Sequence, residues 1–535
     1  MCFASGMATK VTDFKDETLL LVFTLFLIIL ISRIGYFIVN RLINSSKGQQ
    51  QRKNERKMDF FESVLDEFHA QGGANMCFGL KLRSKSSLSF DHVYEALKFV
   101  SRKHPLFRFV IAQKRNDDNE NVKYIRIVTD KNMVTLNESC LKDWVSVWQK
   151  EVQTKFDCES GPLWKATALK ERYDATQQEY HNTLLFTFYH GTVDGMSLLT
   201  LAQEFVQCLE KLSKGVLGPQ DDQKTGIMPG VMTLLASRQF SHYRVLQWLL
   251  PEYLLLRLVM FAMRINLGFA ARNPVLSQHS EEINFDKIET GRKDMIKIIP
   301  RELSLVDTQK LITLSRRNFC TVYGAILACC HLAVAKLVPN KQKNSVKFQW
   351  YCPVNVRDQC EPKVQKDDLG FYTTIMMENA NVPNISLANL TEFWKFAKEC
   401  TLVVHEGIRK GRHLMSLYLL PISDLIDPNE FVSEFLLHSK MRRPGLMSPV
   451  HSLTNLGKID WAKEKDDTYE IESAFGGSGA YENGATFTNH MATFNGVFTW
   501  STSYVTSSVT EETAEKYVNL VFEILLNVLS SSDEN

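Results

Sequence analysis

The hydrophobic and polar positions of this 535-residue chain alternate between strand-like and helix-like patterns over two long regions, residues 58–230 and 291–535. Residues 89–105 show the helix-like pattern clearly, because their apolar side chains recur every three to four positions. Ser89 is a candidate N-cap for that helix, and Pro105 would end it. The apolar stripe consists of Val93, Leu97 and Val100. The alternation predicts an α/β protein with two halves of similar size.

The predicted elements of both halves follow from the same patterns. In the first half we expect strands at 76–82, 107–113, 122–128, 161–169 and 183–190, and helices near 141–154 and 196–212. In the second half we expect two helices within 301–337, the second opening at Thr321, and further helices at 387–409 and 510–529. The predicted strands of that half are 346–357, ending at Pro353, and 370–378, 450–459 and 493–505.

A long apolar run precedes the first half. Residues 19–39 carry a single charge, Arg33, and are long enough to cross about 30 Å of hydrocarbon as a helix. No cleavage site with small residues follows the run, which favours an uncleaved anchor over a signal peptide. Basic residues dominate after the run and acidic residues before it, so the positive-inside rule places residues 1–18 outside the cytosol and the large C-terminal part inside. We expect a single-pass protein, with the endoplasmic reticulum as its membrane.

Two further segments differ from the alternating regions. Residues 40–57 are polar and basic, and we expect a linker there. Residues 231–290 form the crossover between the halves and contain a dense apolar stretch at 243–271, which charged residues and Pro251 interrupt. This stretch is either a buried or interfacial pair of helices, or a shallow membrane insertion or lid over an apolar substrate path.

The composition excludes several classes of protein. Apolar residues make up 44% of the chain and charged residues 23%, which is typical of globular proteins and not of disordered ones. Lys plus Arg number 62 against 60 for Asp plus Glu, so no basic field indicates a nucleic-acid partner. The eleven cysteines are scattered and include no Cys-x-x-Cys pair, which argues against a metal site and favours reduced thiols.

The candidate chemistry lies in "FYHGTVDGMS", residues 188–197, where a predicted strand meets a predicted helix. His190 stands at the strand end, and its ordinary pKa of about 6.5 suits a general base at neutral pH. Asp194 is spaced to turn back beneath the loop, where a buried carboxylate needs a cationic partner. Gly195 leaves room for a ligand to approach. Taken alone, His190 is also compatible with an ordinary core histidine.

Three more stretches strengthen the chemical interpretation: "FDCESGPLWKATAL" (156–169), "CPVNVRD" (352–358) and "TNLGKID" (454–460). Together with His-x-x-x-Asp-Gly they resemble the CoA-dependent acyltransferase superfamily, which includes chloramphenicol acetyltransferase, and look closest to its alcohol O-acetyltransferase and condensation-domain branches. The resemblance covers about residues 60–530. It implies two pseudo-symmetric α/β halves with a tunnel through their interface, open to the donor at one end and to the acceptor at the other.

The resemblance also assigns roles to residues. His190 matches the catalytic histidine, whereas Asp194, Gly195 and Arg357 match structural positions at the active site, with Arg357 expected to pair with Asp194. Residues that the resemblance places as candidates for the channel lining are Tyr189, Asn455, Leu456 and Gly457. Tyr189 departs from branches that carry two histidines in tandem. Thr192, Ser452 and Thr454 offer hydroxyls near the reaction, and each is equally compatible with a simple loop or strand role.

These observations lead to one main hypothesis with two alternatives. We expect a membrane-anchored acyltransferase that takes an acyl group from acyl-CoA as co-substrate and gives it to a hydrophobic alcohol or lipid. Amide formation on an amine acceptor would use the same base. A catalytically inactive, lipid-binding member of the same fold is the second alternative. Membrane contact is expected through residues 19–39, with 243–271 as a further candidate.

Overall fold

The computed structural model describes residues 54–530 with internal gaps. The gaps are 71–74, 116–120, 130–132, 217–223, 225, 240–272 apart from Leu254, Arg257 and Phe261, 277–294, 339–344, 387–388, 416–447 apart from Pro428, 462–466 and 480–483. The predicted anchor at 19–39, most of the predicted linker and nearly all of 243–271 therefore lie outside the described residues.

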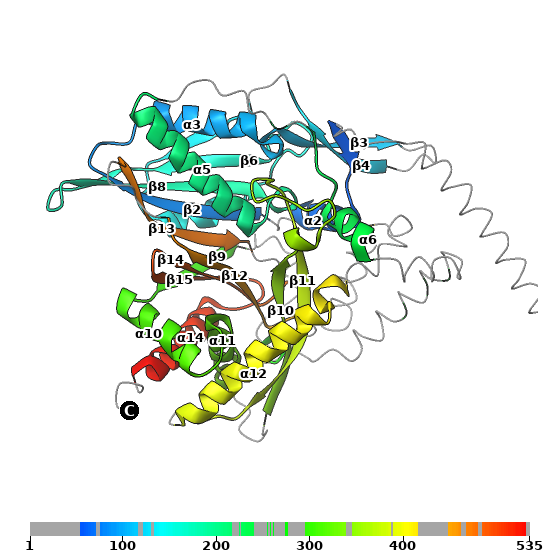
Figure 1. Cartoon of the computed structure of the whole chain (residues 1–535), viewed down its shortest axis with the longest axis vertical. Coiled ribbons are helices and arrows are strands. Elements are labelled where there is room, and N and C mark those ends of the chain that lie inside the picture. The colour runs from blue at the N-terminus through cyan, green and yellow to red at the C-terminus, as the bar shows by residue number, and fades with distance from the viewer. Residues whose placement is uncertain are drawn as a thin grey trace, which may run out of the picture.

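The N-terminal half, drawn in the upper part of Figure 1, is built on one large sheet and one small sheet. Its strands are β1 (Glu55–Lys57), β2 (Asn75–Ser84), β3 (Phe109–Arg115), β4 (Asn121–Ile127), β5 (Leu136–Ser139), β6 (Trp164–Leu169), β7 (Arg172–Asp174) and β8 (Glu179–Tyr189). Its helices are α2 (Phe60–Ala70), α3 (Phe90–Lys103), α4 (Trp144–Glu151), α5 (Gly195–Ser213) and α6 (Val231–Gln239), with 3₁₀ turns η1 (Pro105–Arg108) and η2 (His190–Thr192).

The C-terminal half, in the lower part of Figure 1, is built on a six-stranded sheet in the order β11-β10-β12-β14-β15-β9. The strands of this part of the chain are β9 (Ile296–Glu302), β10 (Ser345–Asn355), β11 (Thr373–Pro383), β12 (His451–Ile459), β13 (Tyr469–Ser478), β14 (Phe487–Phe494) and β15 (Val497–Val505). The helices are α10 (Leu305–Arg317), α11 (Val322–Leu337), α12 (Leu390–Arg409) and α14 (Glu511–Ser530), with a 3₁₀ turn η4 (Arg357–Gln359).

The local signals in the sequence place several elements correctly. Ser89 caps α3 by accepting a hydrogen bond from the backbone N–H of His92, and the helix ends at Lys103, two residues before Pro105. Thr321 caps α11 in the same way by accepting from Gly324. The strand expected at 493–505 is instead interrupted, because Asn495 and Gly496 both have positive φ and close the hairpin between β14 and β15, the turn that an Asn-Gly pair favours.

Strand β13 joins the two halves. It comes from the C-terminal part of the chain, yet it pairs antiparallel with β2 and extends the sheet β13-β2-β8-β6-β5 of the N-terminal half (Figure 1). Tyr469, Ile471 and Ala474 of β13 are buried in the same core as β2 and β8. The two halves therefore share a sheet and a core, which fixes the surfaces that face each other between them.

Two predicted boundaries are wrong in ways that bear on how the halves pack. Residues 55–57 were expected in the linker but form β1, which pairs with β4, because Arg56 bonds to the carbonyl of Met228 and to Glu62. Strand β10 was expected to end at Pro353 but continues to Asn355. β10 pairs with β12 only at Trp350 and Tyr351, so one edge of the strand is unpaired by the time it reaches Pro353, where a residue without an amide hydrogen is tolerated.

The described part of the chain contains long helices, most of them amphipathic. No single helix there is long and apolar enough to cross a bilayer. The bent pair α10 and α11 meets the criteria of length and composition together, with a bend of 100° between its members. Most of α11 is buried in the core of the C-terminal half, and that burial accounts for its apolar character.

That core contains two buried histidines. His451 of β12 is fully buried, and its ring lies 6.0 Å from that of Trp350 and 5.1 Å from that of His331 on α11. Among the described residues, neither ring nitrogen of His451 has a hydrogen-bond partner. Burial lowers the pKa of His451 to about 3 and lowers the pKa of His331 well below its ordinary value. Both imidazoles are therefore neutral in the folded protein at neutral pH.

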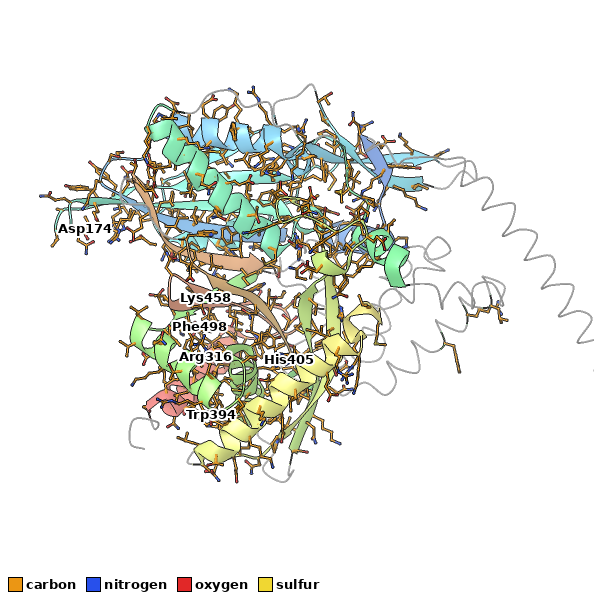
Figure 2. All side chains as sticks on the ribbon, in the orientation of Figure 1. Asp174, Arg316, Trp394, His405, Lys458 and Phe498 are labelled. Atoms are coloured by element: carbon orange, nitrogen blue, oxygen red, sulfur yellow. The ribbon has the colours of Figure 1, made fainter. Side chains whose placement is uncertain are left out.

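We expect the folded state to lose stability as the pH falls below about 6.5, because only the unfolded chain then binds protons at these sites. For His451 the loss amounts to about 2 kcal/mol between pH 6.5 and pH 5. Urea unfolding of the His451→Phe variant should show a shallower dependence on pH than the wild type. His405, exposed on α12 (Figure 2), supplies the matched control, since His405→Asn should leave the dependence unchanged. Equal slopes in all three proteins would contradict the expectation.

Candidate active site

His190 lies where β8 ends and the turn η2 begins, directly before helix α5. Its Nδ1 lies 3.0 Å from the carbonyl oxygen of Val193. Because a carbonyl oxygen only accepts, the ring proton is on Nδ1 in the neutral imidazole, and Nε2 is the unprotonated nitrogen. Burial lowers the pKa of His190, and the bond to Val193 offsets part of that effect. His190 is therefore a neutral imidazole at neutral pH, with one basic nitrogen left over.

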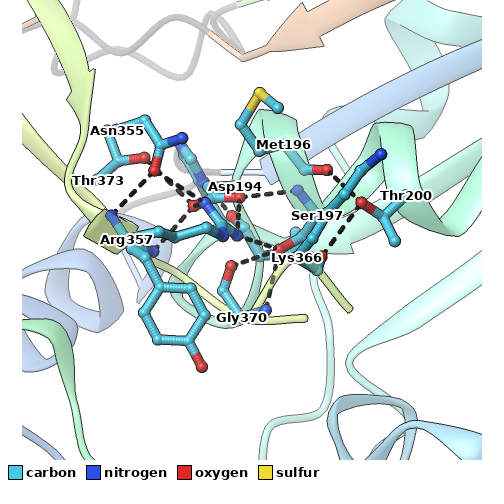
Figure 3. A network of polar contacts seen from close by, with 12 residues as sticks. Asp194, Met196, Ser197, Thr200, Asn355, Arg357, Lys366, Gly370 and Thr373 are labelled. Atoms are coloured by element: carbon cyan, nitrogen blue, oxygen red, sulfur yellow. Dashed lines mark hydrogen bonds and ion pairs between the residues drawn. The ribbon is translucent and has the colours of Figure 1, made fainter. Parts of the chain in front are cut away.

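Asp194 and Arg357 form a buried ion pair across the two halves (Figure 3). The two terminal nitrogens of Arg357 donate to the two carboxylate oxygens of Asp194 at 2.7 and 2.8 Å. Both side chains are less than 10% exposed. Burial alone would raise the pKa of Asp194, but the charge of Arg357 and the hydrogen bonds that the carboxylate accepts outweigh it and lower that pKa. The pair expected from the resemblance is present, and it connects the start of α5 to η4.

The same carboxylate holds backbone groups of both halves. Asp194 is the N-cap of α5 and accepts from the backbone N–H of Ser197 at 2.9 Å. It also accepts from the backbone N–H of Tyr372 at 2.9 Å. Ser197 accepts from Arg357 and from the N–H of Gly370, and its hydroxyl donates to the carbonyl of Gly370 (Figure 3). The loop that carries His190 is therefore fixed to the segment before β11 by a closed hydrogen-bond network.

His190 lines a hollow between the two halves, which we call the apolar hollow; with the adjoining open solvent it spans about 1400 Å³. The N-terminal half contributes α2, β2 and α5, and the C-terminal part contributes strands β10 to β15. The large apolar residues that line it include Phe61, Leu65, Met76, Phe78, Met196, Leu199, Ile375 and Leu456. The hollow therefore presents a basic nitrogen at the end of a largely apolar surface.

A second hollow, of about 580 Å³, lies on the other side of the His190 loop, and we call it the polar hollow. Gly191 and Thr192 line it, as do the segments 226–230 and 368–372. Its charged and ionisable lining residues are Arg56, Glu62, His104, Lys224 and Asp368. The two hollows are thus bounded by consecutive residues of one loop.

The structure separates the residues expected to line the channel. Asn455 and Leu456 face the apolar hollow, as do Ser452 and Thr454. Tyr189 does not, because its side chain is buried and its hydroxyl donates to Asp66 of α2 at 2.8 Å. Gly457 does not line either hollow; its φ of +83° places it at the irregularity where β12 and β14 lose register.

Gly195 leaves space, as expected, but a protein side chain fills it. A Cβ at this position would lie 2.5 Å from Cδ2 of Leu456. Leu456 comes from β12, so the missing side chain lets the C-terminal half pack on the first turn of α5. The room at Gly195 therefore serves the contact between the halves, and Gly195 also lines the apolar hollow. Thr192 is also occupied, since its hydroxyl donates to the carbonyl of Tyr189 at 2.8 Å.

Sequence reasoning missed a second histidine in the apolar hollow. His490 of β14 lines it and is 7% exposed. Its Nε2 accepts from the backbone N–H of Ser478 at 3.2 Å, and burial together with the nearby His190 lowers its pKa to about 4. Gly477 makes room for the ring, because a Cβ there would lie 2.3 Å from Nδ1. The only sequence signal was a histidine inside a strand-like stretch, which does not identify a cavity.

In the part of the chain that the structure describes, no group of three or more His, Cys, Asp or Glu side chains could hold a metal ion. The ten cysteines of that part are all free thiols. Burial raises the pKa of several of them, including Cys330 to about 12, so they are poor nucleophiles. The ionisable residues that line the apolar hollow are the two histidines, Tyr351 and Asp194, and the carboxylate of Asp194 is engaged by Arg357.

The site thus places an imidazole with an unprotonated nitrogen where two α/β halves meet, on a loop that a buried aspartate–arginine pair fixes. The family model for alcohol acetyltransferase matches residues 135–526, and the chain belongs to this family. A search of curated proteins found no match.

Solved structures show the same fold at low sequence identity. The trichothecene 15-O-acetyltransferase from Fusarium sporotrichioides aligns over 90% of this chain and 96% of its own, with 11% identity and a TM-score of 0.65. Polyketide synthase associated protein 5 from Mycobacterium tuberculosis aligns over 89% and 98%, with 14% identity and a TM-score of 0.56. The condensation domain of the Monacolin K polyketide synthase MokA aligns over 88% and 96%, with 14% identity and a TM-score of 0.54.

Proposed function

We propose that this protein transfers an acyl group from an acyl-CoA to the hydroxyl of a hydrophobic alcohol or lipid, with His190 as general base. The observation that carries the proposal is the position of His190. Its Nδ1–H is engaged by Val193, so the unprotonated Nε2 is the nitrogen available to the hollow that both halves line. The family to which the chain belongs supports acyl transfer as the reaction class.

The transfer needs one base and no covalent acyl-enzyme. Nε2 of His190 takes the hydroxyl proton of the alcohol while the alcohol oxygen attacks the carbonyl carbon of the thioester. The tetrahedral intermediate collapses with cleavage of the carbon–sulfur bond, and the imidazolium returns the proton to the CoA thiolate. A neutral imidazole is required at the start, and the lowered pKa of His190 provides it.

The lining of the apolar hollow supports a hydrophobic substrate. Apolar side chains from α2, α5, β10, β13 and β14 cover most of its wall, and burial of a hydrocarbon chain there contributes about 25 cal/mol per Å². Phe61, Met196 and Leu199 are among the large residues that such a chain would contact. A small polar acceptor would leave this surface unused.

Anchoring in a membrane is the other part of the proposal, and the sequence of residues 19–39 supports it. The first strand of the described part is β1, where Arg56 bonds to Glu62 and to the carbonyl of Met228. An anchored body with a cytosolic active site would draw water-soluble acyl-CoA from the cytosol and hydrophobic acceptors from the bilayer of the endoplasmic reticulum.

One experiment tests transfer and anchoring together. Membranes that carry the full chain are washed at alkaline pH and then given acyl-CoAs of graded chain length with long-chain alcohols, short alcohols or amines. We expect release of free CoA with formation of an ester, fastest with the hydrophobic alcohols. If an amide is the main product, the acceptor is an amine and not an alcohol. If the protein binds acyl-CoA but releases no free CoA, it is an inactive lipid-binding protein. Activity removed by the wash would contradict the anchor.

A further inference from the structure

The two hollows meet at one side chain. Among the described residues, Phe371 is the single residue that lines both the apolar hollow and the polar hollow. The backbone on either side of it divides in the same way, since Gly370 and Tyr372 line the polar hollow and Thr373 lines the apolar one. The other part of the boundary is the His190 loop, in which His190 faces the apolar hollow and Gly191 the polar one.

Phe371 is in contact with the base. Its ring lies 5.5 Å from that of His190, centroid to centroid, at an angle of 75° between the ring planes. The ring of Phe61 from α2 lies 5.6 Å away on the apolar side. The contact with His190 is edge-to-face, which is favourable at this separation, and the ring of Phe61 packs on Phe371 at an angle of 35°. The aromatic ring therefore both holds the imidazole and closes the space beside it.

The backbone of Phe371 is fixed on both sides. Gly370 accepts from the backbone N–H of Asp194 at 3.1 Å and exchanges two hydrogen bonds with the hydroxyl of Ser197. Tyr372 donates its backbone N–H to the carboxylate of Asp194. The guanidinium of Arg357 also lies over the ring of Tyr372, with its Cζ 4.8 Å from the ring centroid. The buried ion pair therefore determines where the ring of Phe371 stands relative to His190.

We infer that Phe371 is a specificity-determining residue that separates the two hollows, limits the length of the chain that the apolar hollow accepts, and excludes water from the base. The inference rests on the proposed function, because it concerns the substrates of the same histidine. It assigns to Phe371 a contact with substrate as well as with His190.

The exclusion of water has a chemical consequence. If water reached Nε2 of His190, the same base would take a proton from water while its oxygen attacks the thioester carbon. The carbon–sulfur bond would break and yield a free carboxylic acid and CoA, so that the donor is hydrolysed without transfer. The polar hollow, lined by the charged residues Arg56, Glu62 and Lys224, is the side from which that water would come.

Two substitutions at Phe371 test the inference in opposite directions. Phe371→Ala removes the ring that both hollows share, and we expect the optimum of kcat/KM to shift to longer acyl or alcohol chains. We also expect the ratio of acyl-CoA hydrolysis to transfer to rise about tenfold. Phe371→Trp should shift the optimum to shorter chains and leave the ratio low. If Phe371→Ala melts below the assay temperature, Phe371→Leu is measured instead and should shift both quantities in the direction expected for Ala.

Phe61→Ala is the matched control. Phe61 touches Phe371 and lines only the apolar hollow, so its loss should change the chain-length optimum and leave the hydrolysis ratio at the wild-type value. Equal hydrolysis ratios in wild type, Phe371→Ala and Phe61→Ala would overturn the separating role, and so would a rise of equal size in both variants. A wild-type protein without transfer activity would instead refute the proposed function. The failure of the proposed function is thus distinguishable from failure of the role inferred for Phe371.

Discussion

Replacement of His190 by alanine is expected to lower the rate of acyl transfer by about 10²- to 10⁴-fold, the range that loss of a general base produces. The variant keeps the buried pair between Asp194 and Arg357, which does not involve the imidazole. Its melting temperature should therefore stay close to that of the wild type. The measurement is CoA release from purified membranes at saturating acyl-CoA and alcohol, normalised to folded protein.

His181 provides the control for this variant. It lies on the same strand β8, and its Nδ1 is 3.1 Å from the carboxylate of Glu472, outside both hollows. His181→Gln should leave the rate nearly unchanged. In the wild type, the rate should rise with pH through a pKa below 6.5 and then level, because the base acts unprotonated and burial lowers the pKa of His190. A His190→Ala enzyme with unchanged turnover would show that the imidazole is an ordinary partly buried histidine.

Local signals in the sequence were sufficient for elements whose partners are near in the chain. Ser89 and Thr321 cap their helices through bonds that span three residues, so residue type and spacing alone predict them. His190 at the end of a strand is of the same kind, because the apolar run of β8 ends there. The capping of α5 by Asp194 follows the same rule, although its pairing with Arg357, 163 residues away, came from the family resemblance.

Pairings between distant segments were beyond a single sequence. Strand β13 extends the sheet of the N-terminal half, and its own sequence pattern does not indicate that β2 is its partner. The direction of Tyr189 depends on the carboxylate of Asp66, which lies 123 residues earlier in the chain. Phe371 and His490 become site residues only when β11 and β14 are brought beside α5. In each case the deciding contact lies far away along the chain.

The second large effect is expected from Asp194→Asn. The amide keeps an oxygen that accepts hydrogen bonds but carries no charge, so the guanidinium of Arg357 is left buried without its counter-ion. Removing one partner of a buried ion pair lowers the free energy of unfolding by about 3–5 kcal/mol. Activity should fall as well, because Asp194 holds the backbone N–H of Tyr372 and thereby the position of Phe371 beside His190. Urea unfolding at neutral pH and CoA release measure the two effects.

A double-mutant cycle separates the ion pair from its hydrogen bonds. The double variant Asp194→Asn, Arg357→Met removes both charges. Its loss in free energy of unfolding should be smaller than the sum of the losses in the two single variants. Ser197→Ala leaves the ion pair in place and removes the hydrogen bonds of the Ser197 hydroxyl to Gly370 and Arg357. It should lower the free energy of unfolding by about 1–3 kcal/mol. If Asp194→Asn loses activity at wild-type stability, Asp194 takes part in the chemistry itself. If stability falls, with coupling to Arg357, its role is to hold the two halves together around the base.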